Sequence, residues 1–418
     1  MITPAYSPTA SERVLPRMAL DFTTGTLDSR VTVTRSLNTA TRVNSSGLVE
    51  TVNANLPRFD YDPVTLASRG LLIEESRANL LLRSAEFDVS PWFVDNVSVT
   101  ANSTTAPDGT TTADAIIENL ATSNHNINTT ATVTVAPHTF SAYVKPNGRS
   151  WVRLFVFQSG ITANSTWFNV STGVAGFASA GASNVSIRPA GNGWYRCSIT
   201  FTPASAGSAS FYIAAANADG AGVYAGDNTS GLFIWGAQAE LGAFSTSYIP
   251  TTSTSLTRNA DAVSMTGTNF SSWYNATEGT LQVIGSMNTA STSIFQSFAM
   301  LGDANNSLQI FNNLSASRFR GDIYSGGALQ KAFTYTAAGA PASGTTYNII
   351  VGLKANDFAM AINGNTVATA NSGLMPVSPS ALYIGSVNTG AQQIGGYIRK
   401  LAYYNQKLTN SEIQAFSK

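Results

Sequence analysis

Hydrophobic and polar positions alternate along much of this chain, in short runs separated by Gly, Pro and Asn. The run SWVRLFVF, which ends at Phe157, alternates most cleanly. A period of two places successive side chains on opposite faces of a β-strand. One face would carry Trp151, Arg153, Phe155 and Phe157, and the other Val152, Leu154 and Val156. Because both faces are largely apolar, we expect a central strand that is covered on both sides.

Similar runs recur at the spacing of β-sandwich strands, so we predict an all-β protein. The runs fall into two groups, at 80–255 and 279–418, with a linker at 256–278. Each group is long enough to form a jelly-roll domain with its own core.

Two local signals mark turns and ends. Asn363-Gly364 is a strong signal for a hairpin turn. Near the C-terminal end, Thr409 and Glu412 have the spacing of a helix capping box. We therefore predict a short final helix whose apolar face carries Ile413 and Phe416.

Residues 1–79 have a different character from the rest. They are rich in arginine, their short β-like pieces are separated by polar turns, and few large hydrophobic residues occur before Leu71. We interpret this segment as an extended arm that gains order by packing on a partner. The alternative is that it forms the first β-rich layer of the following domain.

The composition narrows the class of protein. Only 11% of the residues are charged and the formal net charge is zero. Nothing resembles the basic surface of a nucleic-acid-binding protein, so no nucleic-acid partner is expected. No apolar stretch approaches the roughly 18 residues of a membrane span, and no signal-peptide pattern opens the chain. We therefore expect a protein that is made in the cytoplasm and does not insert into a membrane.

Cys197 is the only cysteine, which excludes an intrachain disulfide. It alternates within the strand-like run WYRCSITF, on the same face as Tyr195 and Ile199. We expect a buried, unreactive thiol there.

Several phrases occur in an order that carries a family resemblance: TFSAYVK, GNGWYRCSITFT, IWGAQAELGAFSTSYIPT and RNADAV. Over about residues 79–263 they resemble the carbohydrate-binding-module-like jelly roll of bacteriophage fibre, head-spike and decoration proteins. The preceding segment is similar to the one that usually precedes this module in phage fibre proteins. The final GYIRKLAYYNQKLTNSEIQAF is similar to the closing strand and helix of a laminin-G or concanavalin-A-like domain.

The resemblance implies a structural virion surface protein: a fibre, a head spike or a tail fibre. Such proteins usually form homotrimers. Residues 1–79 would attach the chain to capsid or tail proteins, and the sandwiches would engage host-surface polysaccharide. A capsid decoration or cement protein that binds no receptor is the alternative, and a polysaccharide depolymerase is the third possibility.

Sugar binding by a β-sandwich needs aromatic faces for stacking and polar side chains that read hydroxyl groups. For Trp194 and Trp235, which lie in apolar strands, core packing is the expectation. Trp167 has polar neighbours, so we expect its ring to be exposed. The candidate glycan-binding residues are Trp151, Arg153, Trp167, Tyr195 and Arg196.

Metal and catalytic signals are weak, and no cofactor is expected. Asp303, Asn305 and Asn306 form an oxygen-rich turn that suits an ordinary Asx turn, with a calcium ion as the lesser alternative. No nucleophile-elbow, zinc-protease, CxxC or P-loop motif is present, so the chain is not expected to be an enzyme. His125 and His138 stand beside turn residues, which predicts solvated loop histidines.

Overall fold

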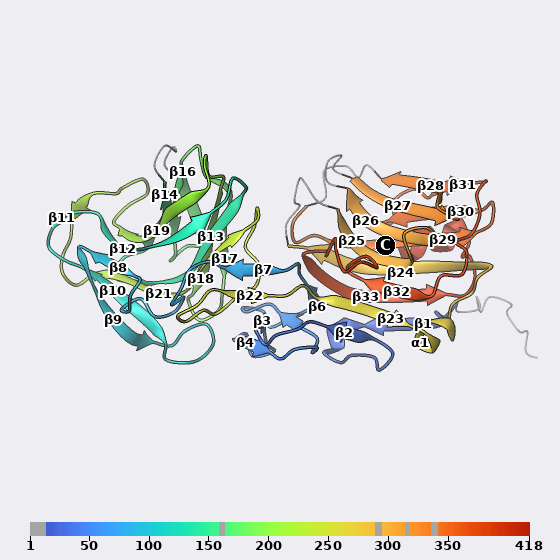
Figure 1. Cartoon of the computed structure of the whole chain (residues 1–418), viewed down its shortest axis with the longest axis horizontal. Helices are drawn as coiled ribbons and strands as arrows, with labels where there is room; N and C mark the ends of the chain where they lie inside the picture. The colour runs from blue at the N-terminus through green and yellow to red at the C-terminus, as the bar shows by residue number, and fades with distance from the viewer. Residues whose placement is uncertain (1–13, 159–163, 289–294, 314–317, 336–341) are drawn as a thin grey trace, which may run out of the picture.

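The computed structural model describes residues 14–158, 164–288, 295–313, 318–335 and 342–418. In these residues the chain forms two β-sandwiches that lie next to each other along the long axis of the molecule (Figure 1). Helical structure in the described ranges is limited to short segments, which confirms the all-β prediction; these are η1 (Phe22–Thr24), α1 (Thr268–Ser271) and α2 (Asn410–Phe416).

The first sandwich has two six-stranded sheets, each named here after an inner strand. The β13 sheet has the order β17 (Ser183–Pro189), β18 (Tyr195–Phe201), β13 (His138–Asn147), β21 (Gly231–Leu241), β10 (Ala113–Glu118) and β9 (Val97–Thr104). The β14 sheet has the order β16 (Val174–Ala178), β15 (Asn164–Asn169), β14 (Trp151–Phe157), β19 (Gly207–Ala216), β12 (His125–Val133) and β8 (Phe93–Asp95). A two-stranded ribbon of β11 (Thr122–Ser123) and β20 (Tyr224–Ala225) lies beside them.

The alternation seen in the sequence builds the core between these sheets. Val152, Leu154 and Val156 of β14 are fully buried and pack with Cys197 and Ile199 of β18. Burial raises the pKa of the Cys197 thiol well above its usual range, so the thiol stays protonated. The expectation of a buried thiol is therefore confirmed.

The second sandwich has one sheet on each side of a larger core. The β24 sheet has the order β31 (Ala368–Ala370), β30 (Phe358–Ile362), β29 (Thr346–Lys354), β24 (Glu278–Met287), β33 (Gly396–Tyr404), β6 (Ser68–Ile73) and β5 (Phe59–Tyr61), with β1 (Met18–Asp21) also paired to β33. The β25 sheet has the order β2 (Thr32–Thr34), β23 (Ala262–Thr266), β32 (Ala381–Ile384), β25 (Gln296–Gly302), β26 (Ser307–Asn313), β27 (Arg318–Ser325) and β28 (Ala328–Tyr335).

The described part of the expected arm is not extended, because its strands belong to the second sandwich. Strand β1 pairs with β33, β2 with β23, and β6 with β33. Met18, Leu20 and Phe22 alternate into the core, where they are buried. Residues 1–13, at the start of the same segment, lie outside the described residues. Both ends of the chain thus build the second sandwich, and the first sandwich is inserted between them.

Two strands that run between the sandwiches connect them (Figure 1). They are β7 (Arg77–Asn79) and β22 (Leu256–Arg258), which pair in antiparallel fashion. The expected linker at 256–278 is accordingly structured, since it contains β22, β23 and α1. A hairpin of β3 (Ala40–Val43) and β4 (Val49–Val52) lies beside the same junction.

Helix α2 closes the chain as the capping box predicts. The Thr409 side chain accepts a hydrogen bond from the Glu412 amide, and the Glu412 carboxylate accepts one from the Thr409 amide. Ile413 is fully buried, and Phe416 is half-buried against Tyr404.

A buried ionic cluster lies where the connecting strands enter the second sandwich. Arg58 pairs with Glu74 at 2.7 Å and with Asp261, and Arg35 pairs with Asp261 at 2.8 Å. The fifth member, Arg258, lies 3.6 Å from Glu74. Arg258 and Asp261 lie in the phrase RNADAV, so this phrase encodes part of the junction between the sandwiches.

Candidate functional site

The outward face of the β14 sheet is the surface on which the predicted site residues gather. Its inner face packs in the core, whereas Trp151, Arg153 and Phe155 are only half-buried on the other side. Phe157 on the same strand is 54% exposed, and Phe93 on β8 is 62% exposed. The expectation that β14 is covered on both sides is therefore wrong, and its outer apolar face is open to solvent.

The strand register arranges this face in rows across the sheet. One row is formed by side chains from β8 to β15: Phe93, Asn128, Tyr212, Phe155 and Ser165. The next row is Asp95, Asn126, Ala214, Arg153 and Trp167. The small Ala214 lies between larger neighbours in its own row and next to the larger Tyr212 along β19. A platform with aromatic rings, amides and one guanidinium results.

Arg153 lies between the aromatic rings of Phe155 and Trp167 on this face. Its guanidinium lies 4.2 Å from the centre of the Phe155 ring and 4.6 Å from that of Trp167. Phe155 in turn stacks on Tyr212 with ring centres 4.0 Å apart. Among the described residues Arg153 makes no hydrogen bond or ion pair, and its Nε atom is shielded from solvent without a partner. Burial lowers its pKa, and no carboxylate offsets this effect.

The loop after β19 fixes one side of the platform. The Trp167 indole Nε1 donates a hydrogen bond to the Ala221 carbonyl at 2.7 Å. Gly222 follows, and a Cβ atom there would lie 3.3 Å from an Arg153 Nη atom. A side chain at this position would crowd the Arg153 guanidinium, and glycine avoids that contact. Trp167 is only 5% exposed, so the expectation of an exposed ring is wrong: Trp167 supports Arg153 from below.

Polar groups on β12 and β8 complete the far side. The Asn126 amide donates to Asp95 at 3.2 Å, and the Asn128 amide donates to Asn126 at 3.4 Å. This chain of hydrogen bonds orients amide oxygens and a carboxylate beside the aromatic rings. Amide and carboxylate groups next to an aromatic surface can accept hydrogen bonds from the hydroxyls of a stacked ring.

The structure therefore unites three of the five predicted site residues and separates two. Trp151, Arg153 and Trp167 share the outward face of the β14 sheet. Tyr195 lies on β18, half-buried against the core of the first sandwich. Arg196 is on the outer face of β18 and donates to the Thr246 carbonyl at 2.6 Å. It lines the junction between the sandwiches, so it belongs to another surface.

Trp194 and Trp235 are buried, as expected. They pack with Tyr143, Tyr248 and Val49 on the outer face of the β13 sheet. Residues of the β3–β4 hairpin and the segment around Tyr248 cover this face. That cover explains why the β13 sheet offers no open aromatic platform like that of the β14 sheet.

Sequence reasoning missed Tyr212, Asn126, Asn128 and Phe93. The run SASFYIAAA alternates, with Phe211 in the core and Tyr212 on the open face, so its pattern held the signal for one of them. For the others the missing information was the strand order. Pairing of β12 with both β19 and β8 is a long-range event that no local pattern specifies.

The Asp303 turn has the geometry of an Asx turn. Asp303 Oδ1 accepts hydrogen bonds from the amides of Asn305 at 2.8 Å and Asn306 at 2.9 Å. The Asn306 side-chain oxygen accepts from the Gly326 amide at 2.8 Å. In the described ranges, no group of three or more His, Cys, Asp or Glu side chains is arranged to hold a metal ion.

The two histidines and the closest pair of carboxylates in the ionic cluster are buried and do not lie on the β14 face. His125 and His138 are buried within β12 and β13, so the expectation of solvated loop histidines is wrong. Glu74 and Asp261 are close together, but both are buried and make ion pairs with arginines.

In the described residues no helix has the length and hydropathy needed to cross a bilayer.

No protein-family model matches the chain, and no curated protein matches it. Solved structures match it at low scores. A Ruminococcus gnavus sialidase carbohydrate-binding module, CBM40, has a TM-score of 0.31 and 15% identity over 36% of this chain and 88% of its own. The fourth domain of a GH43 arabinanase from Geobacillus stearothermophilus, in complex with arabinotriose, has a TM-score of 0.29 and 12% identity over 38% of this chain and 73% of its own.

Chicken galectin 2 has a TM-score of 0.22 and 16% identity, over 30% of this chain and 88% of its own. All three neighbours cover only part of this chain. Scores at this level do not transfer a function, which has to come from the residues of the chain itself.

Proposed function

We propose that this chain is a non-enzymatic glycan-binding protein and that the outward face of the β14 sheet is its binding surface. One observation carries the proposal. Arg153 is half-buried between Phe155 and Trp167 and has no polar partner among the described residues. A desolvated charge without a partner costs free energy, and a bound ligand would relieve that cost.

The chemistry of the face suits a saccharide. Tyr212 and Phe155 offer flat apolar area for the C–H face of a sugar ring. Arg153 donates hydrogen bonds in a planar fork, and the half-buried Asn128 and the exposed Asp95 add further polar groups, with the buried Asn126 between them. A neutral molecular surface with little charge suits contact with glycans that are themselves mostly uncharged.

We further propose that the protein acts on a virion surface, as a fibre, head spike or tail fibre that forms a homotrimer. The sequence resemblance supports this part. The anchor to capsid or tail proteins would lie within residues 1–79, of which residues 14–79 are described and also build part of the second sandwich. Immunogold electron microscopy of particles would test the location, and label absent from all particles would contradict it.

Binding is tested on a glycan array with the full chain. The wild type should bind a subset of glycans, and Arg153→Gln should lose about tenfold or more in affinity, since a hydrogen bond to a charged group is worth about 1.5–3 kcal/mol. Arg320→Gln is the matched control. Arg320 also lies over a phenylalanine, Phe311, but it is paired with Asp322 at 2.8 Å.

Two array results would contradict the proposal. The first is no binding by the wild type, which would favour the alternative of a cement protein. The second is equal binding by the wild type and Arg153→Gln, which would move the site elsewhere. Release of reducing ends from a host polysaccharide would instead identify a depolymerase.

A further inference from the structure

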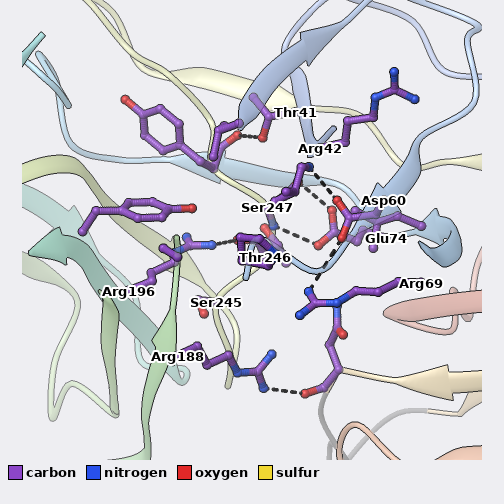
Figure 2. Close-up of a pocket in the computed structure, with 18 of the residues that line it drawn as sticks. Thr41, Arg42, Asp60, Arg69, Glu74, Arg188, Arg196, Ser245, Thr246 and Ser247 are labelled. Carbon is purple, nitrogen blue, oxygen red and sulfur yellow. Dashed lines mark hydrogen bonds and ion pairs between the residues drawn. The ribbon is translucent and has the colours of Figure 1, made fainter. Parts of the chain in front are cut away.

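A cleft between the two sandwiches is a second candidate site (Figure 2). It has a cavity volume of about 130 Å³ and is partly open to solvent. Its walls come from the β3–β4 hairpin and β5 on one side, from β17 and β18 on the other, and from the segment Ser245–Tyr248. Four arginines line it: Arg42, Arg69, Arg188 and Arg196.

Two of the four arginines make an ion pair with a carboxylate, and two do not. Arg42 pairs with Glu50 at 2.6 Å and Arg69 with Asp62 at 2.8 Å. In the described residues, Arg188 and Arg196 have no carboxylate within ion-pair distance. They stand directly opposite each other on β17 and β18. Like charges in such a cross-strand pair repel each other. The carboxylates of Asp60 and Glu74 also line the cleft, but neither makes an ion pair with Arg188 or Arg196.

Neutral groups hold both side chains in place. Arg196 donates to the Thr246 carbonyl at 2.6 Å and to the Ser141 hydroxyl at 3.1 Å, and its guanidinium lies 5.2 Å from the Tyr143 ring centre. Arg188 donates to the Asn288 carbonyl at 3.0 Å, across the gap between the sandwiches. Carbonyls and hydroxyls orient a guanidinium but leave its charge in place.

Hydroxyl groups lie around the two charges. Ser198 follows Arg196 on the same face of β18, and Figure 2 shows Ser245 beside the cleft, near the side chains of Arg188 and Arg196. We propose that the cleft binds an acidic saccharide, whose oxyanion is held by Arg188 and Arg196 and whose hydroxyls reach Ser198 and Ser245. Arginine forks match carboxylate and sulfate geometry well.

Calorimetric titration of the full chain tests this site. Glucuronate should bind and glucose should not, because the arginines recognise the oxyanion. Arg188→Gln and Arg196→Gln should each weaken glucuronate binding about tenfold or more. Arg42→Gln is the matched control in the same cleft, because Glu50 already neutralises Arg42; it should change the affinity much less.

Inorganic sulfate separates the sources of the oxyanion. Weaker binding of sulfate than of glucuronate supports a saccharide site, and equal or tighter binding of sulfate overturns it. Equal binding of glucose and glucuronate, or no binding of either, also overturns the proposal. So does unchanged binding by folded Arg188→Gln and Arg196→Gln proteins, with thermal unfolding as the check on folding.

The proposed binding sites in the cleft and on the β14 face can be tested independently of each other. Arg153→Gln should leave glucuronate binding in the cleft unchanged, and Arg188→Gln should leave array binding by the β14 face unchanged. If Arg153→Gln alone abolished glucuronate binding, the oxyanion would lie on the β14 face and the cleft proposal would be wrong.

Discussion

Arginine has two contrasting environments in this protein. Arg58 is fully buried and makes ion pairs with Glu74 and Asp261, which raise its pKa against the effect of burial. Arg153 is half-buried between aromatic rings and has no such partner in the described chain. The first arrangement is what a structural ion pair needs, and the second is what a ligand-binding group needs.

Replacing Arg153 should therefore leave stability nearly unchanged. Arg153→Met keeps an apolar stem on the rings, loses a stacking energy of about 0.5–1 kcal/mol and removes a charge that is costly to desolvate. We expect a change in unfolding free energy within about 1 kcal/mol together with loss of glycan binding. Urea denaturation measures the first. A loss of several kcal/mol would instead give Arg153 a structural role.

Glu74 should behave in the opposite way. Burial would raise its pKa, but the charges of Arg258 and Arg58 and the hydrogen bond from Ser247 hold the pKa well below its usual range. Glu74→Gln leaves buried arginines without their partner and should cost about 3–5 kcal/mol at neutral pH. Glu75→Gln, next to it but partly exposed, should cost at most about 1 kcal/mol.

The stabilisation that Glu74 provides should depend on pH in one direction. With a folded-state pKa below the unfolded value of about 4.3, ionised Glu74 stabilises the fold above that pH, and its contribution is lost as the pH falls. The difference between wild type and Glu74→Gln should shrink in denaturation curves at progressively lower pH. A difference that stays constant with pH would contradict this assignment.

At the scale of elements, the sequence predicted those structures that depend on interactions between residues close together in the chain. The alternation of β14 and the capping box of Thr409 and Glu412 are both present in the structure. Short β-like pieces were predicted before Leu71, but their place in the second sandwich was missed, because strands such as β1 and β2 are only three or four residues long and find their partners far along the chain. Their stability comes from sheet pairing and core burial, neither of which leaves a strong local pattern.

Strand β1 should be essential to the second sandwich. Leu20 is buried in the core and Leu15, five positions earlier, is 70% exposed. Leu20→Ala should cost about 2–5 kcal/mol of unfolding free energy, because it leaves a cavity. Leu15→Ala should change it by about 0.5 kcal/mol or less. Equal, small effects of the two variants in urea denaturation would support an arm that does not pack.

At the scale of the molecule, one sandwich is inserted into another. The second sandwich takes strands from residues 18–73 and 262–404, and the paired strands β7 and β22 carry the chain to the first sandwich and back. The two candidate sites follow from this plan. The β14 face points away from the covered β13 sheet, and the cleft exists because residues of both sandwiches meet at the junction.

Truncation tests this plan. A chain that starts at residue 80 loses β1, β2, β5 and β6, and with them Arg58 and Glu74. We expect it to lose the cooperative unfolding of the second sandwich in calorimetry, whereas a chain that starts at residue 14 should keep it. If the shorter chain unfolded like the full protein, residues 14–79 would be dispensable for the fold, as an arm would be.

The most direct measurement is a crystal structure of the full chain with a saccharide selected on the glycan array. We predict electron density for the sugar on the β14 face, with its ring against Tyr212 and Phe155 and a hydrogen bond to the Arg153 guanidinium. Density for the sugar that makes no contact with Arg153, Phe155 or Tyr212 would contradict the account.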